Sequence, residues 1–242
     1  MYIESSDPKI EKIQQAILLN QDMLVASIIW GQRYIGKTSL IKKLYKSATW
    51  VDGSNLKDVH RALLDSSKVV ITNFEKIANI DSLNFENVHV MAIYNGKNFN
   101  KKLEDKFAFI YHFPPLKERE EDVKKFIDYY TKNIKELFDA PEDIKIDESE
   151  IDLSENLKSI KKSIYKAIIL KTLNRDDLYK ALYNYFLNSN LEGNIYDTEL
   201  KIFDKALIDA GMKRFKSQLQ VSKRFGISRN TLRKKIDELK KY

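Results

Sequence analysis

The sequence of 242 residues has no cysteine, and it has only three histidines, four prolines and seven glycines. The absence of cysteine excludes a disulfide framework, thiolate metal sites and cysteine catalysis. His60, His89 and His112 do not form a metal-ligand spacing, so a zinc enzyme is not expected. The scarcity of proline and glycine favours a mostly helical chain with short connections.

The sequence also has no long hydrophobic run. The longest uncharged apolar stretch, residues 23–30, is far too short to span a bilayer. The N-terminus is polar and acidic and does not resemble a signal peptide. We therefore expect a cytoplasmic protein with no membrane partner. A hydrophobic content of 43% is sufficient for a substantial core.

Positive charge is concentrated at one end of the chain. Residues 201–242 contain thirteen Lys/Arg against four Asp/Glu, a net charge of +9, whereas the whole chain carries +7. A basic terminal module is typical of binding to nucleic acid or another anionic surface. A solvated lysine-rich helix is the alternative that composition alone leaves open.

The hydrophobic pattern changes character part-way along the chain. Four short apolar runs separated by helical or polar segments predict buried parallel strands, at residues 23–30, 68–72, 88–93 and 107–113. Pro114 and Pro115 end this α/β pattern. Only helical patterns follow, at residues 118–137, 160–168, 178–186 and 200–210, with an acidic linker at 139–152 and a polar break at 189–194.

Residues 31–38, Gly-Gln-Arg-Tyr-Ile-Gly-Lys-Thr, match the complete P-loop pattern between a predicted strand and a predicted helix. Its glycines let backbone N–H groups face a phosphate, Lys37 would reach the β- and γ-phosphates, and the Thr38 hydroxyl would hold Mg²⁺. The residues expected to bind ATP or ADP here are Gly31, Gln32, Arg33, Tyr34, Ile35, Gly36, Lys37, Thr38 and Ser39. The alternative is a vestigial loop that no longer binds nucleotide.

The candidate catalytic residues follow the predicted strand 68–72. A P-loop ATPase usually carries Asp-Glu at this point, but here the strand is followed by Asn73, Phe74 and Glu75. Asn73 lacks the charge that holds magnesium, although Glu75 has the carboxylate needed to orient water. We therefore expect weak or absent ATP hydrolysis.

Two further segments give the chain a family resemblance. Residues 114–123, Pro-Pro-Leu-Lys-Glu-Arg-Glu-Glu-Asp-Val, resemble the segment that joins the α/β subdomain to the helical lid in NtrC-type AAA+ activators, the sigma-54-dependent enhancer-binding proteins. Residues 226–236 are similar to the Fis-type helix-turn-helix that ends those proteins. The resemblance implies an AAA+ α/β subdomain at 1–115, a helical lid at 116–190 and a Fis-type DNA-binding domain at 195–242.

The resemblance also implies roles for single residues. Asn95 matches the sensor asparagine near the γ-phosphate, and Lys158 stands where the lid has its sensor arginine. Lys106 is the candidate for the position of the arginine finger. The Gly-Ala-Phe-Thr-Gly-Ala loop that contacts the sigma factor is absent from the sequence, and the interval between Thr38 and Asn73 leaves little room for the helix that bears it. Contact with sigma-54 polymerase is therefore not expected.

The C-terminal segment fits the requirements of a helix-turn-helix. Residues 215–225 are the predicted supporting helix, Gly226 the turn and Ser228 the N-cap of a recognition helix over 229–241. Ile227, Leu232, Ile236 and Leu239 should face inward. The residues expected to contact double-stranded DNA are Ser228, Arg229, Asn230, Thr231, Arg233 and Lys234, with Arg229 as the base reader. The resemblance implies a homodimer through residues 198–210.

The leading hypothesis is a sequence-specific, nucleoid-associated bacterial transcriptional regulator, with a degenerate AAA+ core that binds Mg-ATP or ADP and hydrolyses it weakly or not at all. One alternative is an active AAA+ ATPase that remodels a transcription or replication partner. A second alternative is an architectural DNA protein resembling Fis itself, with the core reduced to a scaffold.

Overall fold

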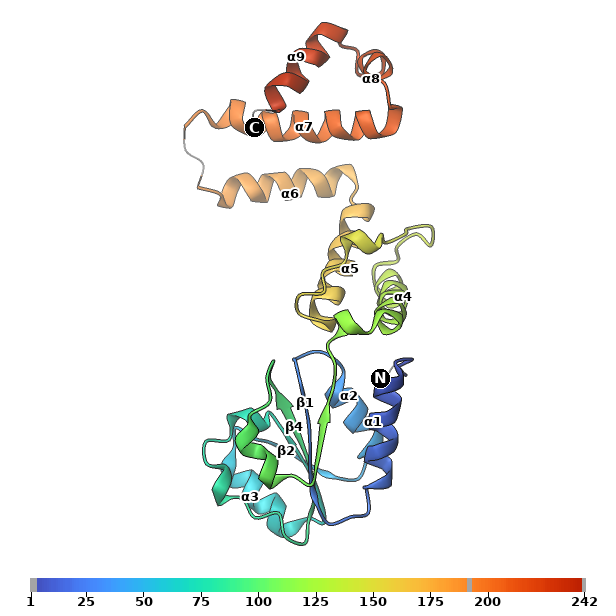
Figure 1. Ribbon diagram of the computed structural model, residues 1–242. Coiled ribbons are helices and arrows are strands. Elements are labelled where there is room, and N and C mark those ends of the chain that lie inside the picture. Colours follow the sequence, from blue (N-terminus) through green and yellow to red (C-terminus); the bar gives the residue numbers. More distant parts are fainter. Residues whose placement is uncertain (1–3, 191–192, 241–242) are drawn as a thin grey trace. The chain divides into compact units, whose positions relative to one another are not determined.

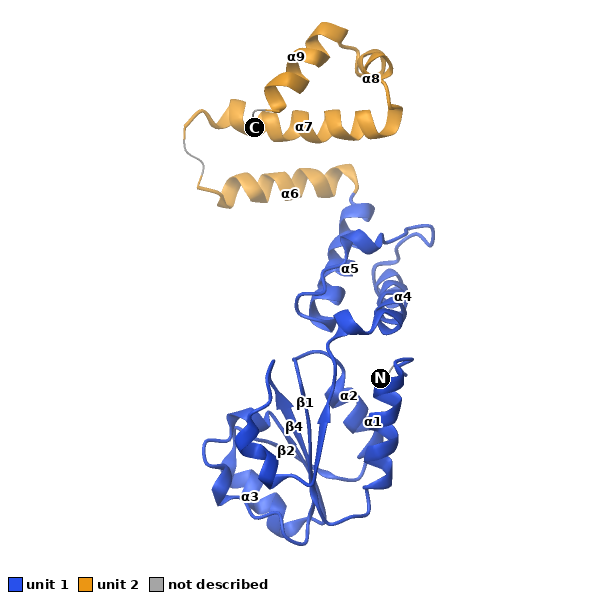
Figure 2. Ribbon diagram, in the orientation of Figure 1, with its two compact units in different colours: residues 1–173 blue, residues 174–242 orange. Residues whose placement is uncertain are grey.

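The computed structural model describes residues 4–190 and 193–240, and the chain divides into two compact units, residues 1–173 and 174–242 (Figures 1 and 2). The strands of the first unit are β1 (Ala26–Gly31), β2 (Thr49–Asp52), β3 (Lys68–Thr72), β4 (His89–Asn95) and β5 (Phe109–His112). Its α-helices are α1 (Pro8–Leu19), α2 (Lys37–Leu44), α3 (Leu56–Asp65), α4 (Glu120–Phe138) and α5 (Leu157–Thr172). This is the α/β core followed by helices that the sequence predicts.

The five strands form one parallel sheet in the order β2-β3-β4-β1-β5. Successive side chains of a strand point to opposite faces of the sheet. Because the central strands contain consecutive apolar residues, both faces of this sheet are apolar. Ile28 of β1 packs in a core with Val59 of α3, whereas Ile29 packs in a second core with Ile17 of α1 and Leu40 of α2. Helices α1 and α2 therefore cover one face and α3 covers the other (Figure 1).

Two elements of the core were missed by the sequence analysis. Strand β2 has only four residues and lies at the edge of the sheet, and none of them is buried, so it lacks the apolar run used to identify strands. Helix α3 follows it and runs unbroken for ten residues. The interval between Thr38 and Asn73 therefore holds one short helix that the sequence analysis did not predict. Strand β1 also starts later than expected, because Met23 and Leu24 are exposed.

The lid helices of the first unit have a core of their own. Phe126 and Ile134 of α4 pack with Ile160, Ile164 and Ile168 of α5, on the face that the spacing of the isoleucines predicts. Residues 139–156 connect the two helices and contain one short 3₁₀ turn, Glu148–Glu150.

The second unit contains α6 (Arg175–Asn188), α7 (Ile195–Phe215), α8 (Gln218–Phe225) and α9 (Arg229–Leu239). Helices α7, α8 and α9 share a small core that includes Ile208, Val221 and Leu232, with Ile227, Ile236 and Leu239 packed against it as expected. Gly211 of α7 lies against the Phe225 ring, since a Cβ there would be 2.5 Å from the ring.

The boundaries of the second unit differ slightly from the prediction. Phe215 ends α7 rather than starting the supporting helix, because Lys216 adopts a left-handed conformation with φ 54°. Residues 191–192 of the predicted break and Lys241 of the predicted recognition helix lie outside the described residues. Over the described part of the chain, no helix is both long enough and apolar enough to cross a membrane.

Candidate functional site

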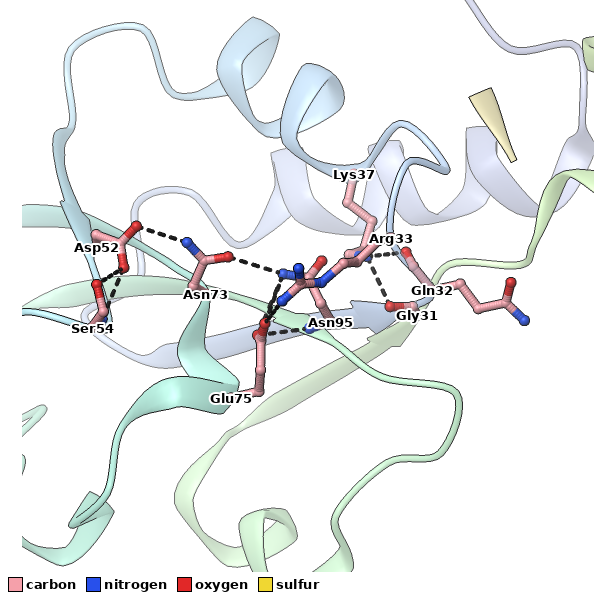
Figure 3. Close-up of polar contacts among 9 residues, drawn as sticks. All are labelled: Gly31, Gln32, Arg33, Lys37, Asp52, Ser54, Asn73, Glu75 and Asn95. Carbon is pink, nitrogen blue, oxygen red and sulfur yellow. Dashed lines mark hydrogen bonds and ion pairs between the residues drawn. The ribbon is translucent and has the colours of Figure 1, made fainter. Parts of the chain in front are cut away.

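The first candidate site lies at the carboxyl edge of the sheet, where parallel α/β folds bind ligands. Strand β1 ends at Gly31, β4 ends at Asn95 and β3 ends at Thr72. Because β4 lies between β1 and β3, the end of β4 separates the P-loop from the residues after β3. Figure 3 shows the resulting group of polar side chains, which also includes Asp52 from the end of β2.

The P-loop backbone has the shape that its glycines permit. Gly31 has φ 151°, and a Cβ there would lie 2.4 Å from the carbonyl oxygen of Phe113. Gly36 has φ 104° and is the N-cap of α2 without a side-chain hydrogen bond, so the first N–H groups of α2 have no side-chain cap. A cradle of this shape fits a phosphate group, whose charge the helix N-terminus stabilises.

Lys37 is inside this cradle with only 3% of its surface exposed. Its Nζ donates hydrogen bonds to the carbonyl oxygens of Gly31 (2.9 Å) and Gln32 (2.5 Å). Burial lowers the pKa of Lys37 to about 7, the nearby Glu75 carboxylate opposes that shift, and the Arg33 guanidinium adds to it. Lys37 is thus a buried amine whose protonation depends on the negative charge placed next to it.

Glu75 and Asn95, both named from the sequence, are brought together. One oxygen of Glu75 accepts the backbone N–H of Asn95 at 2.9 Å, and the other accepts its side-chain Nδ2 at 3.1 Å. Arg33 of the P-loop donates to the same Glu75 carboxylate at 3.1 Å. Asn73 is a weaker neighbour, with its Oδ1 3.4 Å from Asn95 Nδ2. Glu75 therefore supplies the carboxylate that lies next to the P-loop and Asn95.

Asp52 is a second acidic residue at this edge, and the sequence analysis did not identify it. Its carboxylate accepts Asn73 Nδ2 at 2.7 Å and the backbone N–H of Ser54 at 2.8 Å. Hydrogen bonds from Ser54 hold the pKa of Asp52 below its usual value. Thr38, Asp52 and Thr72 line one open hollow of about 670 Å³ beside the P-loop. In the sequence, Asp52 could have been identified only by its position at the end of β2, and that strand was not predicted.

A neighbouring hollow of about 380 Å³ brings most of the predicted nucleotide-binding residues together. It is lined by Tyr34, Ile35, Gly36, Lys37, Thr38, Ser39 and Asn95 from the core and by Tyr130, Leu157 and Lys158 from the lid. Lys158 also donates to Glu155 at 2.8 Å and lies 5.5 Å from the ring centre of Tyr34. Lys106 is not part of this group, and its Nζ pairs with Asp81 at 2.8 Å.

The lid is attached to the P-loop by Asn156, which lies two residues before Lys158. The side chain of Asn156 donates to Gln32 Oε1 and to the carbonyl oxygen of Arg33, both at 3.1 Å, and accepts the N–H of Leu116 at 3.0 Å. The next N–H, that of Leu157, donates to the carbonyl oxygen of Tyr34 at 3.0 Å. Asn156 is 4% exposed, so these bonds are protected from water.

Arg119 supplies a second attachment. Its guanidinium donates to the carbonyl oxygen of Ile35 at 2.6 Å and pairs with Asp122 at 3.0 Å, and both side chains are buried. Asp122 also accepts the backbone N–H of Ser6 at 2.8 Å. The conspicuous Pro-Pro-Leu segment was recognised from the sequence, but its contact with the P-loop spans 84 residues and leaves no local pattern.

The second candidate site is the first two turns of α9. Ser228 caps this helix as expected, because its hydroxyl accepts the N–H of Thr231 at 3.0 Å and bonds the Thr231 hydroxyl at 2.8 Å. Gly226 makes the turn with φ 65°. The predicted DNA-binding residues Arg229, Asn230, Arg233 and Lys234 are all exposed. Such a row of exposed donors on one short helix suits a nucleic-acid groove.

Residues 199–239, which include most of α7 and all of α8 and α9, match the Fis family of bacterial regulatory proteins. The Fis-family module thus covers the basic end of the chain, and it identifies that end as the DNA-binding part of a regulator, as the resemblance implied.

Solved structures match the fold of the whole chain. NtrX from Brucella abortus in complex with ATP aligns over 99% of this chain and 70% of that chain, with a TM-score of 0.54 and 13% sequence identity. The same protein in complex with ADP aligns over 98% and 69%, with a TM-score of 0.53. At this identity the likeness concerns the fold alone, and it confirms the expected order of a parallel-sheet α/β core, a helical region and the Fis-family module.

A curated relative matches over a shorter region. A limonene hydroxylase from Geobacillus stearothermophilus is 26% identical over 145 residues, which are 55% of this chain and 26% of that protein. The match thus spans about a quarter of the relative's length. The hydroxylase activity in that protein's name is not assigned to this chain.

Proposed function

We propose that this protein is a sequence-specific transcriptional regulator whose AAA+ core binds a nucleotide as a regulatory ligand. The observation that carries the proposal is the Fis-family module with Arg229, Asn230, Arg233 and Lys234 exposed at the start of α9. Arg229 reads a base edge, and Arg233 and Lys234 contact phosphates, with the Ser228 and Thr231 hydroxyls beside them. Contact with sigma-54 polymerase is not part of the proposal, because the sequence lacks the contact loop.

DNA binding is tested by fluorescence anisotropy of the full-length protein on duplexes of varied sequence and at several salt concentrations. We expect the logarithm of the binding constant to fall by about 0.9 per phosphate contact for each unit of log salt. A flat salt response would contradict a role for the basic face. Equal affinity for every duplex would contradict sequence specificity and favour an architectural DNA protein.

The core has residues that fit a nucleoside di- or triphosphate. Only glycine fits at position 31 of the cradle, and the buried Lys37 amine lies within it, bonded to the carbonyl oxygens of Gly31 and Gln32. Lys37 and the P-loop backbone would hold the phosphates, and Thr38 would hold Mg²⁺. The phosphates of bound ATP would shift the equilibrium between conformations of the lid.

A second candidate function, an active ATPase, is favoured by one observation. Glu75 is 16% exposed and hydrogen-bonded to Asn95, so a carboxylate capable of orienting water faces the site despite the neutral Asn73. Phosphate release from Mg-ATP over a range of protein concentrations distinguishes the two functions. Turnover that rises with concentration and disappears in Lys37→Ala would support the ATPase, and no turnover would support the regulatory ligand.

We also propose a homodimer formed through α6 and α7. No residue of α6, which is described throughout, is buried, and its Leu182 and Phe186 are 37% and 42% exposed. Leu200 and Phe203 of α7 are 43% and 53% exposed. An apolar surface on two neighbouring helices is typical of an interface. Sedimentation should give a dimer that Leu182→Glu dissociates and that Lys180→Glu, a change at an exposed charge of α6, leaves intact.

A further inference from the structure

Arg33 differs from the other charged residues around the cradle in how it is held. Its backbone is fixed, since its carbonyl oxygen accepts Asn156 Nδ2 at 3.1 Å. Its side chain is 55% exposed and bonds the Glu75 carboxylate at 3.1 Å. Arg33 therefore combines a rigid position in the P-loop with a guanidinium that can change partners at little cost, because a half-exposed ion pair is weak.

Glu75 does not depend on Arg33 for its position. The backbone N–H of Asn95 holds one of its oxygens at 2.9 Å, and the Asn95 side chain donates at 3.1 Å to the oxygen that Arg33 also contacts. Departure of the guanidinium would leave both carboxylate oxygens with a donor. The ion pair is thus a separable contact and not the support of this edge of the sheet.

The charged residues around the cradle indicate which role Arg33 can have. Lys37 Nζ bonds the carbonyl oxygens of Gly31 and Gln32, the two residues before Arg33, and Arg33 bonds Glu75, so the three charges lie close together. Lys106, one of the two lysines that the family resemblance places near a terminal phosphate, pairs with Asp81 and does not line the hollow beside the P-loop, whereas Lys158 lines that hollow from the lid while paired with Glu155. Arg33 belongs to the P-loop itself, and its planar guanidinium presents two parallel N–H groups to a phosphate, a geometry that an ammonium lacks.

We propose that Arg33 makes the core selective for a nucleoside triphosphate over a diphosphate, by moving from Glu75 to the terminal phosphate. A diphosphate is held by the loop backbone and Lys37, and the Arg33–Glu75 pair stays closed. A triphosphate adds negative charge beside the guanidinium, the pair opens, and Glu75 keeps its bonds to Asn95. This inference rests on the proposed nucleotide binding and specifies which nucleotide state the core detects.

The test is calorimetric titration of the full-length protein with Mg-ATPγS and with Mg-ADP, without reference to turnover. We expect the wild type to prefer the triphosphate. Arg33→Gln should weaken Mg-ATPγS binding by about tenfold, the loss of one charge-assisted contact, and leave Mg-ADP binding within about twofold. Arg61→Gln, an exposed arginine of α3, is the matched control and should change neither affinity.

Glu75→Gln provides the opposing variant. It removes the competing charge, so the ratio of Mg-ATPγS affinity to Mg-ADP affinity should rise about threefold. If both variants weakened both ligands alike, the pair would only stabilise the loop, and the proposal would be overturned. Equal affinity of the wild type for both ligands would also overturn it, but would leave nucleotide binding intact. Binding of neither ligand would refute the proposed function as well.

Discussion

In the first unit the polar residues of the candidate site are bonded to one another, whereas in the second unit Arg229 and Arg233 at the start of α9 face solvent. Lys37, Asn95 and Asn156 each make two or more hydrogen bonds within the protein. Arg229 and Arg233 make no hydrogen bond or ion pair with any residue that the structure describes. Internal hydrogen bonds therefore hold the side chains of the first site, whereas these two arginine side chains are not held in this way.

This contrast predicts that single substitutions act locally and differently in the two units. The largest effect is expected for Lys37→Ala, which removes the buried ammonium from the P-loop. Nucleotide affinity should fall by about 100-fold, since several charge-assisted hydrogen bonds to phosphate are lost together. Calorimetric titration with Mg-ADP measures the loss, and unchanged DNA affinity in the same preparation serves as the control. Retained nucleotide affinity would mean that the cradle is vestigial.

Asn156→Ala tests how far the first site depends on internal bonds. The substitution leaves the N–H of Leu116 and the carbonyl oxygen of Arg33 without the partner they have now. It should lower the free energy of unfolding by about 3 kcal/mol, because buried unsatisfied groups cost about 1–3 kcal/mol each. Chemical denaturation followed by circular dichroism measures this. Asn184→Ala, at an exposed position of α6, should change stability by less than about 0.5 kcal/mol.

The reverse behaviour is expected for Arg229→Ala. The substitution should leave the unfolding transition unchanged, because the side chain has no hydrogen-bond or ion-pair partner among the described residues. On a preferred DNA site it should cost about 1–3 kcal/mol of binding free energy, the contribution of a bidentate contact to a base. Anisotropy titrations on a preferred and a scrambled duplex provide the measurement. A variant that binds the preferred duplex as tightly as the parent would remove Arg229 from the interface.

The smallest effect concerns the proton on Lys37. With a pKa of about 7 in the free protein, the amine is mostly neutral at pH 8, and an adjacent phosphate raises the pKa. Binding should then take up about 0.9 proton at pH 8. Affinity is highest below pH 7 and falls as the pH rises through 7. Calorimetry of Mg-ADP binding in buffers of different ionisation enthalpy detects the proton, and Lys37→Arg should show no uptake because arginine stays charged.

These differences also mark what the sequence could and could not predict. The P-loop, the Ser228 cap and the Gly226 turn were predictable, because each depends on residues within one turn or one strand-to-helix junction. Strand β2 was not, since a four-residue edge strand with no buried side chain has no apolar run. Missing β2 also meant missing Asp52, whose relevance depends entirely on where that strand ends.

Long-range contacts were the second feature that could not be predicted from the sequence. Asn156 reaches Gln32 across 124 residues, and Arg119 reaches Ile35 across 84. Neither contact can be predicted from periodicity or composition, so the sequence identified the lid but not the residues that attach it. The direction of the Glu75 carboxylate was also not predictable from the sequence, because Asn73, two residues before it, adopts a left-handed conformation with φ 50°.

The attachment of Asn156 and Leu157 to the P-loop has a consequence for how signals could pass through the chain. Both residues hold loop carbonyl oxygens, and Leu157 is also the first residue of α5. The conformation of the loop and the position of the lid are therefore coupled. Because such coupling is reciprocal, a partner that bound the lid would change the nucleotide affinity by a certain factor, and bound nucleotide would change the partner's affinity by the same factor. Affinity for nucleotide therefore offers a direct way to detect whatever binds the lid.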